Sequence, residues 1–202
     1  MASAAFERFR FSFFEDPDSP RQGLDIAALA ALEGEERHRA ETMLLKFLPD
    51  TRGVIGLGEL RVSRAEPALA QLFAAERHTR SGALTYLARA LWQIRPDPRW
   101  RAALVEVLAT DAEPTHRQDA AQALHDVRDA TAVPALVAAL DDAEPLVRHH
   151  AARALLALHG LPDTSSNTQH MMYRVMAEDA ARHEGGRRDI LAAIEGRDIV
   201  AT

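Results

Sequence analysis

The sequence predicts an all-α protein, an α-α superhelix of about four to five helical pairs, and three observations support this prediction. Strong helix formers such as Ala, Leu, Arg, Glu and Gln dominate most windows, whereas aromatic residues make up only 5% of the 202 positions. Apolar residues recur within these windows at the spacing of one helix face. Similar stretches also return after about 31 to 35 residues, and a fixed period of this length is typical of repeat proteins.

The chain begins with a segment that is rich in phenylalanine. Five of the 7 Phe residues lie within nine positions near the amino terminus. In an extended strand Phe9, Phe11 and Phe13 would share one face, whereas in a helix Phe6, Phe9 and Phe13 would do so. A stacked helical array ends in an apolar face that an atypical terminal element must cover, so we expect residues 1–23 to form an aromatic cap. The alternatives are an anchor for a partner or second copy, and a membrane-surface contact.

The repeat array is expected to occupy residues 24–160. Its elements in order are a leading helix at 24–32, a first pair at 35–48 and 51–60, and further pairs at 65–94, 98–127 and 131–159. After the array come a polar linker at 161–167, a closing helical pair at 168–197 and a tail at 198–202. Asn167 is a good N-cap residue and is expected to start the closing pair.

Corresponding positions in three stretches define the repeat. The aligned sets are Leu57, Leu91 and Leu124; Leu60, Ile94 and Val127; Arg61, Arg95 and Arg128; and Leu69, Leu104 and Leu136. A second similarity lies half a repeat away, where RQDAAQAL at 117–124 matches RHHAARAL at 148–155. Each repeat is therefore expected to contain two helices that are stabilised by stacking on their neighbours.

The clearest repeat lies at residues 129–160. Pro134 stands in the first turn of its first helix, where a missing N–H costs nothing, and Pro145 opens its second helix. Asp142 interrupts the apolar stripe between the two helices, and Gly160 ends the second.

The stretch VPALVAALDDAEPLVRHHAARALLAL in this repeat resembles the short HEAT-like repeats of phycobilin lyases and many bacterial proteins. The resemblance is specific over 129–160, good over 57–127 and thin elsewhere. It implies a solenoid in which the second helices line a concave surface. It also implies that Asp111, Asp142, Arg117 and Arg148 form a structural ladder between repeats rather than a substrate site.

Composition and charge narrow the classes of partner and location. The net charge of -6 argues against a general nucleic-acid binder, which needs a basic face, and favours a basic protein as partner. No segment reaches the roughly 18 to 20 apolar residues of a membrane span, and the amino terminus lacks the features of a signal peptide. With no Cys in the chain, a cytoplasmic location is expected. We expect a monomer or a weak homodimer.

The common catalytic and cofactor motifs are missing from the sequence. GVIGLG at 53–58 lacks the glycine order of a dinucleotide loop, so we interpret it as a helix-packing segment. His149 and His150 could be imagined as metal ligands with Asp119, but we interpret them as solvated surface histidines. No catalytic residue, metal or cofactor is therefore expected, and the protein is predicted not to be an enzyme.

Positions on the second helices that the core does not need are the candidate partner-binding residues. They are Tyr86, Arg89, Trp92, Asp119, Gln122, His125, His150 and Arg153. Leu156 occupies the same aligned column as Trp92 and His125. Aromatic, Arg and adaptable polar residues are favoured in interface cores, although Tyr86 and Trp92 could also fill gaps between repeats.

The sequence thus predicts a non-enzymatic protein-binding scaffold that uses the concave face of the solenoid. A sharper version is a bacterial immunity or inhibitor protein that neutralises a basic nuclease. The competing function is a bilin lyase or lyase-like tetrapyrrole chaperone, because the resemblance includes such proteins and the receiving Cys would belong to the client.

Overall fold

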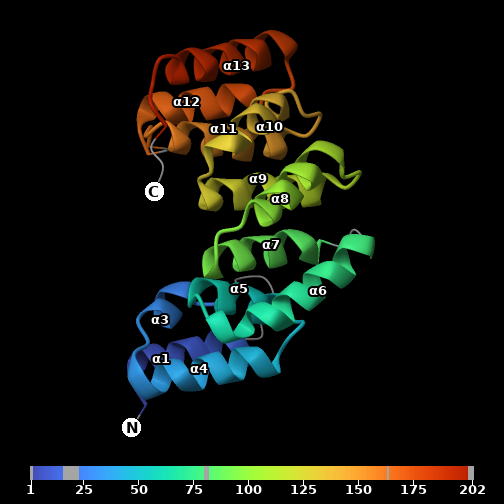
Figure 1. Ribbon diagram of the computed structural model, residues 1–202. Helices are drawn as coiled ribbons and strands as arrows, with labels where there is room; N and C mark the ends of the chain where they lie inside the picture. The colour runs from blue at the N-terminus through green and yellow to red at the C-terminus, as the bar shows by residue number, and fades with distance from the viewer. Residues whose placement is uncertain (1, 16–22, 80–81, 163, 200–202) are drawn as a thin grey trace. The chain divides into compact units, whose positions relative to one another are not determined.

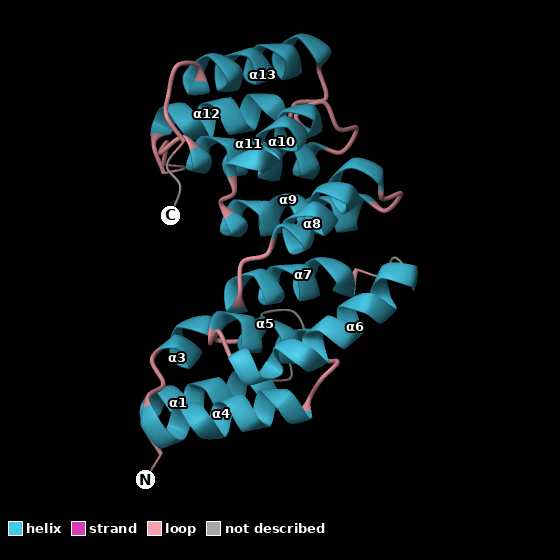
Figure 2. Cartoon of the chain, in the orientation of Figure 1, coloured by secondary structure: helices cyan, strands magenta, loops and turns pink. Residues whose placement is uncertain are grey.

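The computed structural model describes residues 2–15, 23–79, 82–162 and 164–199. Within these ranges the regular structure is entirely helical and no strand is present, as Figure 2 shows. The predicted all-α fold of repeated helices is therefore confirmed. No helix in the described ranges combines the length and apolar character that crossing a bilayer requires.

The chain divides into two compact units at residues 97 and 98, and Figure 1 labels their helices. The first unit contains α1 (Ala4–Arg10), the π-helical turn η1 (Phe11–Glu15), α3 (Ile26–Ala30), α4 (Gly34–Lys46), α5 (Thr51–Glu59), the 3₁₀ turn η2 (Ser63–Ala65), α6 (Glu66–Thr79) and α7 (Ala83–Ile94). Helices α4 and α5 pack together, and α7 packs against both α5 and α6.

The second unit repeats the two-helix arrangement. It contains α8 (Pro98–Thr110), α9 (Pro114–Val127), the 3₁₀ turn η3 (Ala130–Ala132), α10 (Val133–Ala139), α11 (Pro145–Leu158), α12 (Ser166–Val175) and α13 (Ala180–Ile194). Helix α9 packs between α8 and α11, and α11 in turn contacts α10 and α12. The second helices of successive pairs therefore lie against one another.

The aligned leucines form the core of both units. Leu57, Leu91 and Leu124 are fully buried, and so are Leu69, Leu104 and Leu136. One leucine of this kind contributes about 1.5–3 kcal/mol when it leaves water, so these leucines stabilise the packing of helices within each unit. The repeat pattern in the sequence thus corresponds to the buried faces of the helices.

Local sequence signals explain most helix starts, with one correction. Pro145 is the first residue of α11 and Pro134 lies in the first turn of α10, as predicted. The closing pair begins differently, because Ser165 and not Asn167 is the N-cap of α12: its side chain accepts a hydrogen bond from the Thr168 N–H. The expectation for Asn167 was wrong. Residues 165–167 are Ser, Ser and Asn, all of which can cap a helix, and the hydroxyl of Ser165 is the group that does so.

The glycines of GVIGLG lie inside α5, where they permit close packing rather than phosphate binding. A Cβ atom at Gly58 would lie 2.7 Å from the Cα of Ala90 on α7. A Cβ at Gly56 would meet the side chain of Leu44 on α4 at 2.8 Å. Only glycine allows α5 to approach both neighbours so closely, which agrees with the helix-packing interpretation.

The phenylalanines near the amino terminus lie on helical turns, so the strand alternative is wrong. Phe6, Phe9 and Phe13 are 1%, 0% and 2% exposed, whereas Phe11 is 52% exposed. The Phe6 ring lies under the Arg39 guanidinium of α4, at 4.7 Å, and the Phe13 ring meets Phe47 edge-on at 5.1 Å. The buried rings thus cover the first helices of the first unit.

Candidate partner-binding surface

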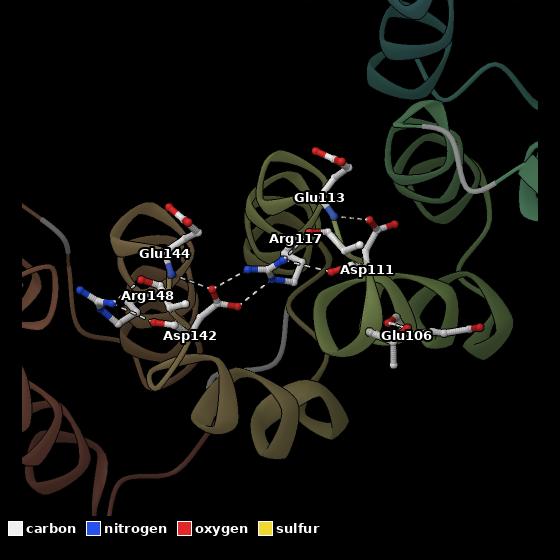
Figure 3. A network of polar contacts seen from close by, with 10 residues as sticks. Glu106, Asp111, Glu113, Arg117, Asp142, Glu144 and Arg148 are labelled. Carbon is white, nitrogen blue, oxygen red and sulfur yellow. Dashed lines mark hydrogen bonds and ion pairs between the residues drawn. The ribbon is translucent and has the colours of Figure 1, made fainter.

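Polar side chains at the amino ends of α9 and α11 hold successive pairs in register (Figure 3). The Arg117 guanidinium donates from Nε and Nη2 to the two carboxylate oxygens of Asp142, both at 2.8 Å, and from Nη1 to the Asp111 carbonyl at 3.0 Å. One Asp142 oxygen also accepts the Glu144 N–H at 2.9 Å. Arg117 therefore links its own repeat to the loop of the next one, as a structural ladder requires.

The ladder ends on the main chain of the closing pair. Arg148, which is 6% exposed, donates to the carbonyl of Asp142 at 2.8 Å and to the carbonyls of Val175, Met176 and Ala177 at 2.7 to 3.1 Å. These three carbonyls lie at the carboxyl end of α12, where helix geometry leaves them without intrahelical partners. Arg148 therefore caps α12 while fixing it against α11.

The ladder determines the charge of Asp142. Burial acts to raise the pKa of this carboxyl, but the hydrogen bonds from Arg117 and the Glu144 N–H, with the attraction of the nearby guanidinium groups, hold the pKa below its usual value. Hydrogen bonding to Asp142 likewise raises the pKa of Arg117. The pair stays charged at neutral pH, and these two side chains are committed to structure rather than to binding.

Three of the predicted binding residues gather in the second unit. His125 lies in the last turn of α9, and His150 and Arg153 lie on α11, each of them half-buried. Burial, together with repulsion from the neighbouring His149, Arg153 and His125, lowers the pKa of His150 to about 4. The interpretation of His150 as a solvated histidine is therefore wrong: it is a half-buried neutral imidazole in a region of positive charge.

An open groove of about 420 Å³ lies beside His125 and Arg153. Six of its lining residues are His125, Arg128, Arg153, Ala157, Leu161 and Thr164. It lies at the carboxyl ends of α9 and α11, at the turn that leads towards α12. The structure thus places two of the predicted binding residues at the wall of a surface depression.

The remaining second-unit positions differ in exposure. Gln122 on α9 is exposed and Asp119 is half-buried, so the side chain of Gln122 can reach a partner. Leu156, by contrast, is fully buried. The expectation that Leu156, like Trp92 and His125, faces away from the core was wrong, because its apolar side chain enters the core of the second unit.

The other predicted residues lie on α7 in the first unit, where Tyr86, Arg89 and Trp92 are half-buried. Arg89 donates to Glu59 on α5 at 2.7 Å, and Gln93 donates to the same carboxylate oxygen at 3.1 Å. Arg89 therefore connects two helices of the core, contrary to the expectation that the core does not need it. The predicted set is divided between the units, with three residues in the first and five in the second.

Tyr86 also borders a small cavity of about 110 Å³ inside the first unit. The lining comes from α5, α6 and α7, and it includes Val54, Leu72 and Leu87. Tyr86 thus contributes to packing between these helices, which was one of the two alternatives for its role. Among the described residues, no three His, Asp or Glu side chains lie close enough together to hold a metal ion.

Sequence reasoning missed Arg128 as a residue of the groove. Arg128 is the C-cap of α9 and has a φ of 49°, in the left-handed region that non-glycine residues rarely adopt. Arg61, which aligns with it, has a φ of 52°, whereas Arg95 in the same column is extended. The column of arginines was visible in the sequence, but its backbone conformation was not.

Comparison with known proteins agrees with this architecture. The family model for HEAT repeats matches residues 101–172, from within α8 to within α12. Over this stretch the chain is similar to HEAT repeats. The resemblance expected from the sequence is confirmed there, and the Arg117–Asp142 ladder lies inside the matched HEAT repeats. No curated protein and no solved structure matches the chain significantly.

Proposed function

We propose that this protein is a non-enzymatic scaffold that binds another protein through side chains of the second helices α7, α9 and α11. The observation that carries the proposal is that α9 and α11 hold one another through the ladder at one end, while Gln122, His125 and Arg153 remain at the surface near an open groove. Arg and adaptable polar side chains are favoured in interface cores. HEAT repeats commonly mediate protein interactions, which supports the same function.

The charge of the whole chain supports a basic partner. A net charge of -6 attracts a positively charged protein over distances of about one Debye length, about 8 Å at physiological ionic strength. An immunity or inhibitor protein that neutralises a basic nuclease fits this charge. We accordingly expect the association rate to fall several-fold between low and physiological salt.

Capture experiments with matched variants test the proposal. Trp92→Ala and Arg153→Ala remove candidate anchors, while Gln71→Ala and Glu106→Ala change exposed residues on the first helices α6 and α8. A partner captured from lysate is purified and its affinity for each variant is measured by calorimetry. We expect the anchor variants to lose about 1–4 kcal/mol of binding free energy and the controls to lose almost nothing.

Two results would contradict the proposal. Wild-type affinity in the anchor variants, together with loss in the α6 and α8 variants, would place binding on the opposite helices. Tight binding of an open-chain tetrapyrrole, measured by absorbance, would favour the bilin-lyase alternative if no protein is captured in a variant-dependent way.

A further inference from the structure

The described side chains that line the groove at the carboxyl ends of α9 and α11 include two arginines, and the nearby carboxylate of Asp126 lies 3.0 Å from His125 Nδ1. The described lining of the groove contains the cationic side chains of Arg128 and Arg153 and the imidazole of His125, and none of the described lining residues is acidic. The chain as a whole carries -6. The net charge of the chain determines which proteins it attracts from a distance. A group inside the groove interacts instead with the nearby arginines, and salt screens these short-range interactions much less.

Arg128 is available to a ligand and is held in an unusual conformation. Within the described part of the chain its guanidinium makes no hydrogen bond or ion pair, unlike Arg117, Arg148 and Arg89. Its left-handed backbone, with φ 49°, is one that glycine adopts more easily.

We propose that this groove receives a carboxylate side chain of an acidic segment in the protein partner, and that Arg128 binds it beside the positive charge of Arg153. A guanidinium matches a carboxylate in two parallel hydrogen bonds, and such charge-assisted pairs are about twice as strong as neutral ones. The inference rests on the proposed function and adds to it. The partner's overall surface is basic, while the group that it inserts here is acidic.

A peptide titration of the full-length protein tests the groove directly. The probes are acetyl-hexaglutamate amide and, as a neutral match, acetyl-hexaglutamine amide, each added to the ¹⁵N-labelled protein. We expect the hexaglutamate peptide to shift the amide signals of residues 125, 128, 153, 160, 161 and 164 specifically, and the glutamine peptide to shift none of them. Equal shifts with both peptides, or no shift at these amides, would overturn the proposal.

Arg128→Gln should weaken hexaglutamate binding roughly tenfold or more, as expected for loss of a charge-assisted pair. Arg61→Gln is the matched control, because Arg61 is exposed and has the same left-handed backbone in the first unit. Arg128→Gly guards against misfolding, since glycine relieves the strained φ while removing the guanidinium. Unchanged binding in both Arg128 variants, or equal loss in Arg61→Gln, refutes the assignment.

Inorganic phosphate separates a carboxylate site from a general anion site. If phosphate saturates the same amide shifts at lower concentration than hexaglutamate does, the carboxylate assignment is wrong. The two proposals also fail separately. If the affinity of a captured partner depends on Trp92 but not on Arg128, the scaffold function stands and the carboxylate site is refuted. If hexaglutamate binds but no partner is captured, the carboxylate site stands and the scaffold function is refuted.

Discussion

The guanidinium of Arg117 and the carboxylate of Asp142 form a two-bond pair across successive helical pairs, with both hydrogen bonds at 2.8 Å. The side chains are 14% and 11% exposed, so water competes weakly for the pair. Because Arg117 comes from α9 and Asp142 from the loop before α11, the contact fixes the register of one repeat on the next.

Breaking this pair should destabilise the second unit measurably. Asp142→Ala removes the carboxylate partner of Arg117, and we expect a loss of about 2–3 kcal/mol in the free energy of unfolding, measured by urea denaturation. A double-mutant cycle with Arg117→Ala should give a coupling of about 1 kcal/mol or more. The exposed pair Arg188 and Glu184, at 3.8 Å, is the control and should show almost none. A coupling near zero for Arg117 and Asp142 would mean that the ladder is not stabilising.

The ladder should weaken in acid. The pKa of Asp142 is lowered on folding, so its contribution is present above the ordinary value of 3.8 and is lost as pH falls below it. The coupling measured by the double-mutant cycle should therefore be smaller at pH 3 than at pH 7. An unchanged coupling at pH 3 would contradict the charged state assigned to the pair.

His150 should make stability depend on pH in a higher range. Its pKa falls from the ordinary 6.5 to about 4 on folding, so the unfolded chain binds more protons between these values. Stability is therefore complete above pH 6.5 and decreases as pH falls towards 4. For this half-exposed side chain we expect a loss of about 1 kcal/mol between pH 7 and pH 5, measured by thermal unfolding and absent in His150→Gln. His170→Gln, at an exposed position on α12, should retain the pH dependence.

The two adjacent glycines of α13 should respond differently to alanine. A Cβ at Gly186 would lie 2.4 Å from the backbone nitrogen of Val175, whereas one at Gly185 meets the flexible end of the Arg174 side chain. Gly186→Ala should cost about 1–3 kcal/mol, because α12 must move away. Gly185→Ala should be near neutral, since the helix preference of alanine offsets the displacement of Arg174 from Asp189. Equal melting temperatures for the two variants would contradict this packing.

The aromatic segment at the amino terminus gives a fifth test. Phe9→Ala removes a ring that is 0% exposed and should cost about 3–5 kcal/mol, whereas Phe11→Ala, at 52% exposure, should change stability by less than about 0.5 kcal/mol. Deleting residues 6–14 should lower the melting temperature of the first unit and promote aggregation. A stable, monomeric deletion variant that no longer binds the partner would make the rings an interface anchor instead of a cap.

Periodicity in the sequence was enough to predict the helical pairs. The leucines at 57, 91 and 124 repeat because each must fill the same place in a stack, and all three are buried. The structural roles of Arg117 and Arg148 could likewise be predicted, because the resemblance to HEAT-like repeats implied a ladder at these positions. Their partners differ, a carboxylate in one case and main-chain carbonyls in the other, and the second kind leaves no mark in the side-chain sequence.

The candidate site was harder to predict, because side-chain exposure depends on neighbouring helices. Arg89 turned inward to Glu59, and Leu156 entered the core despite its aligned position. The apolar character of Leu156 was the available signal. Arg128 was missed because helix propensity favours glycine or asparagine at a left-handed C-cap. Only the three-dimensional arrangement brings it beside Arg153 and His125.

The way in which the ladder ends has an evolutionary consequence. The contact between positions 117 and 142 joins two side chains of opposite charge. Substitutions at one position should therefore be accompanied by compensating substitutions at the other. Arg148 binds only carbonyl oxygens, which every residue type supplies, so its contacts place no demand on the side chains at positions 175–177 while Arg148 stays constant. In an alignment of relatives, covariation should therefore appear for the first contact and vanish for the second, although both hold the same stack together.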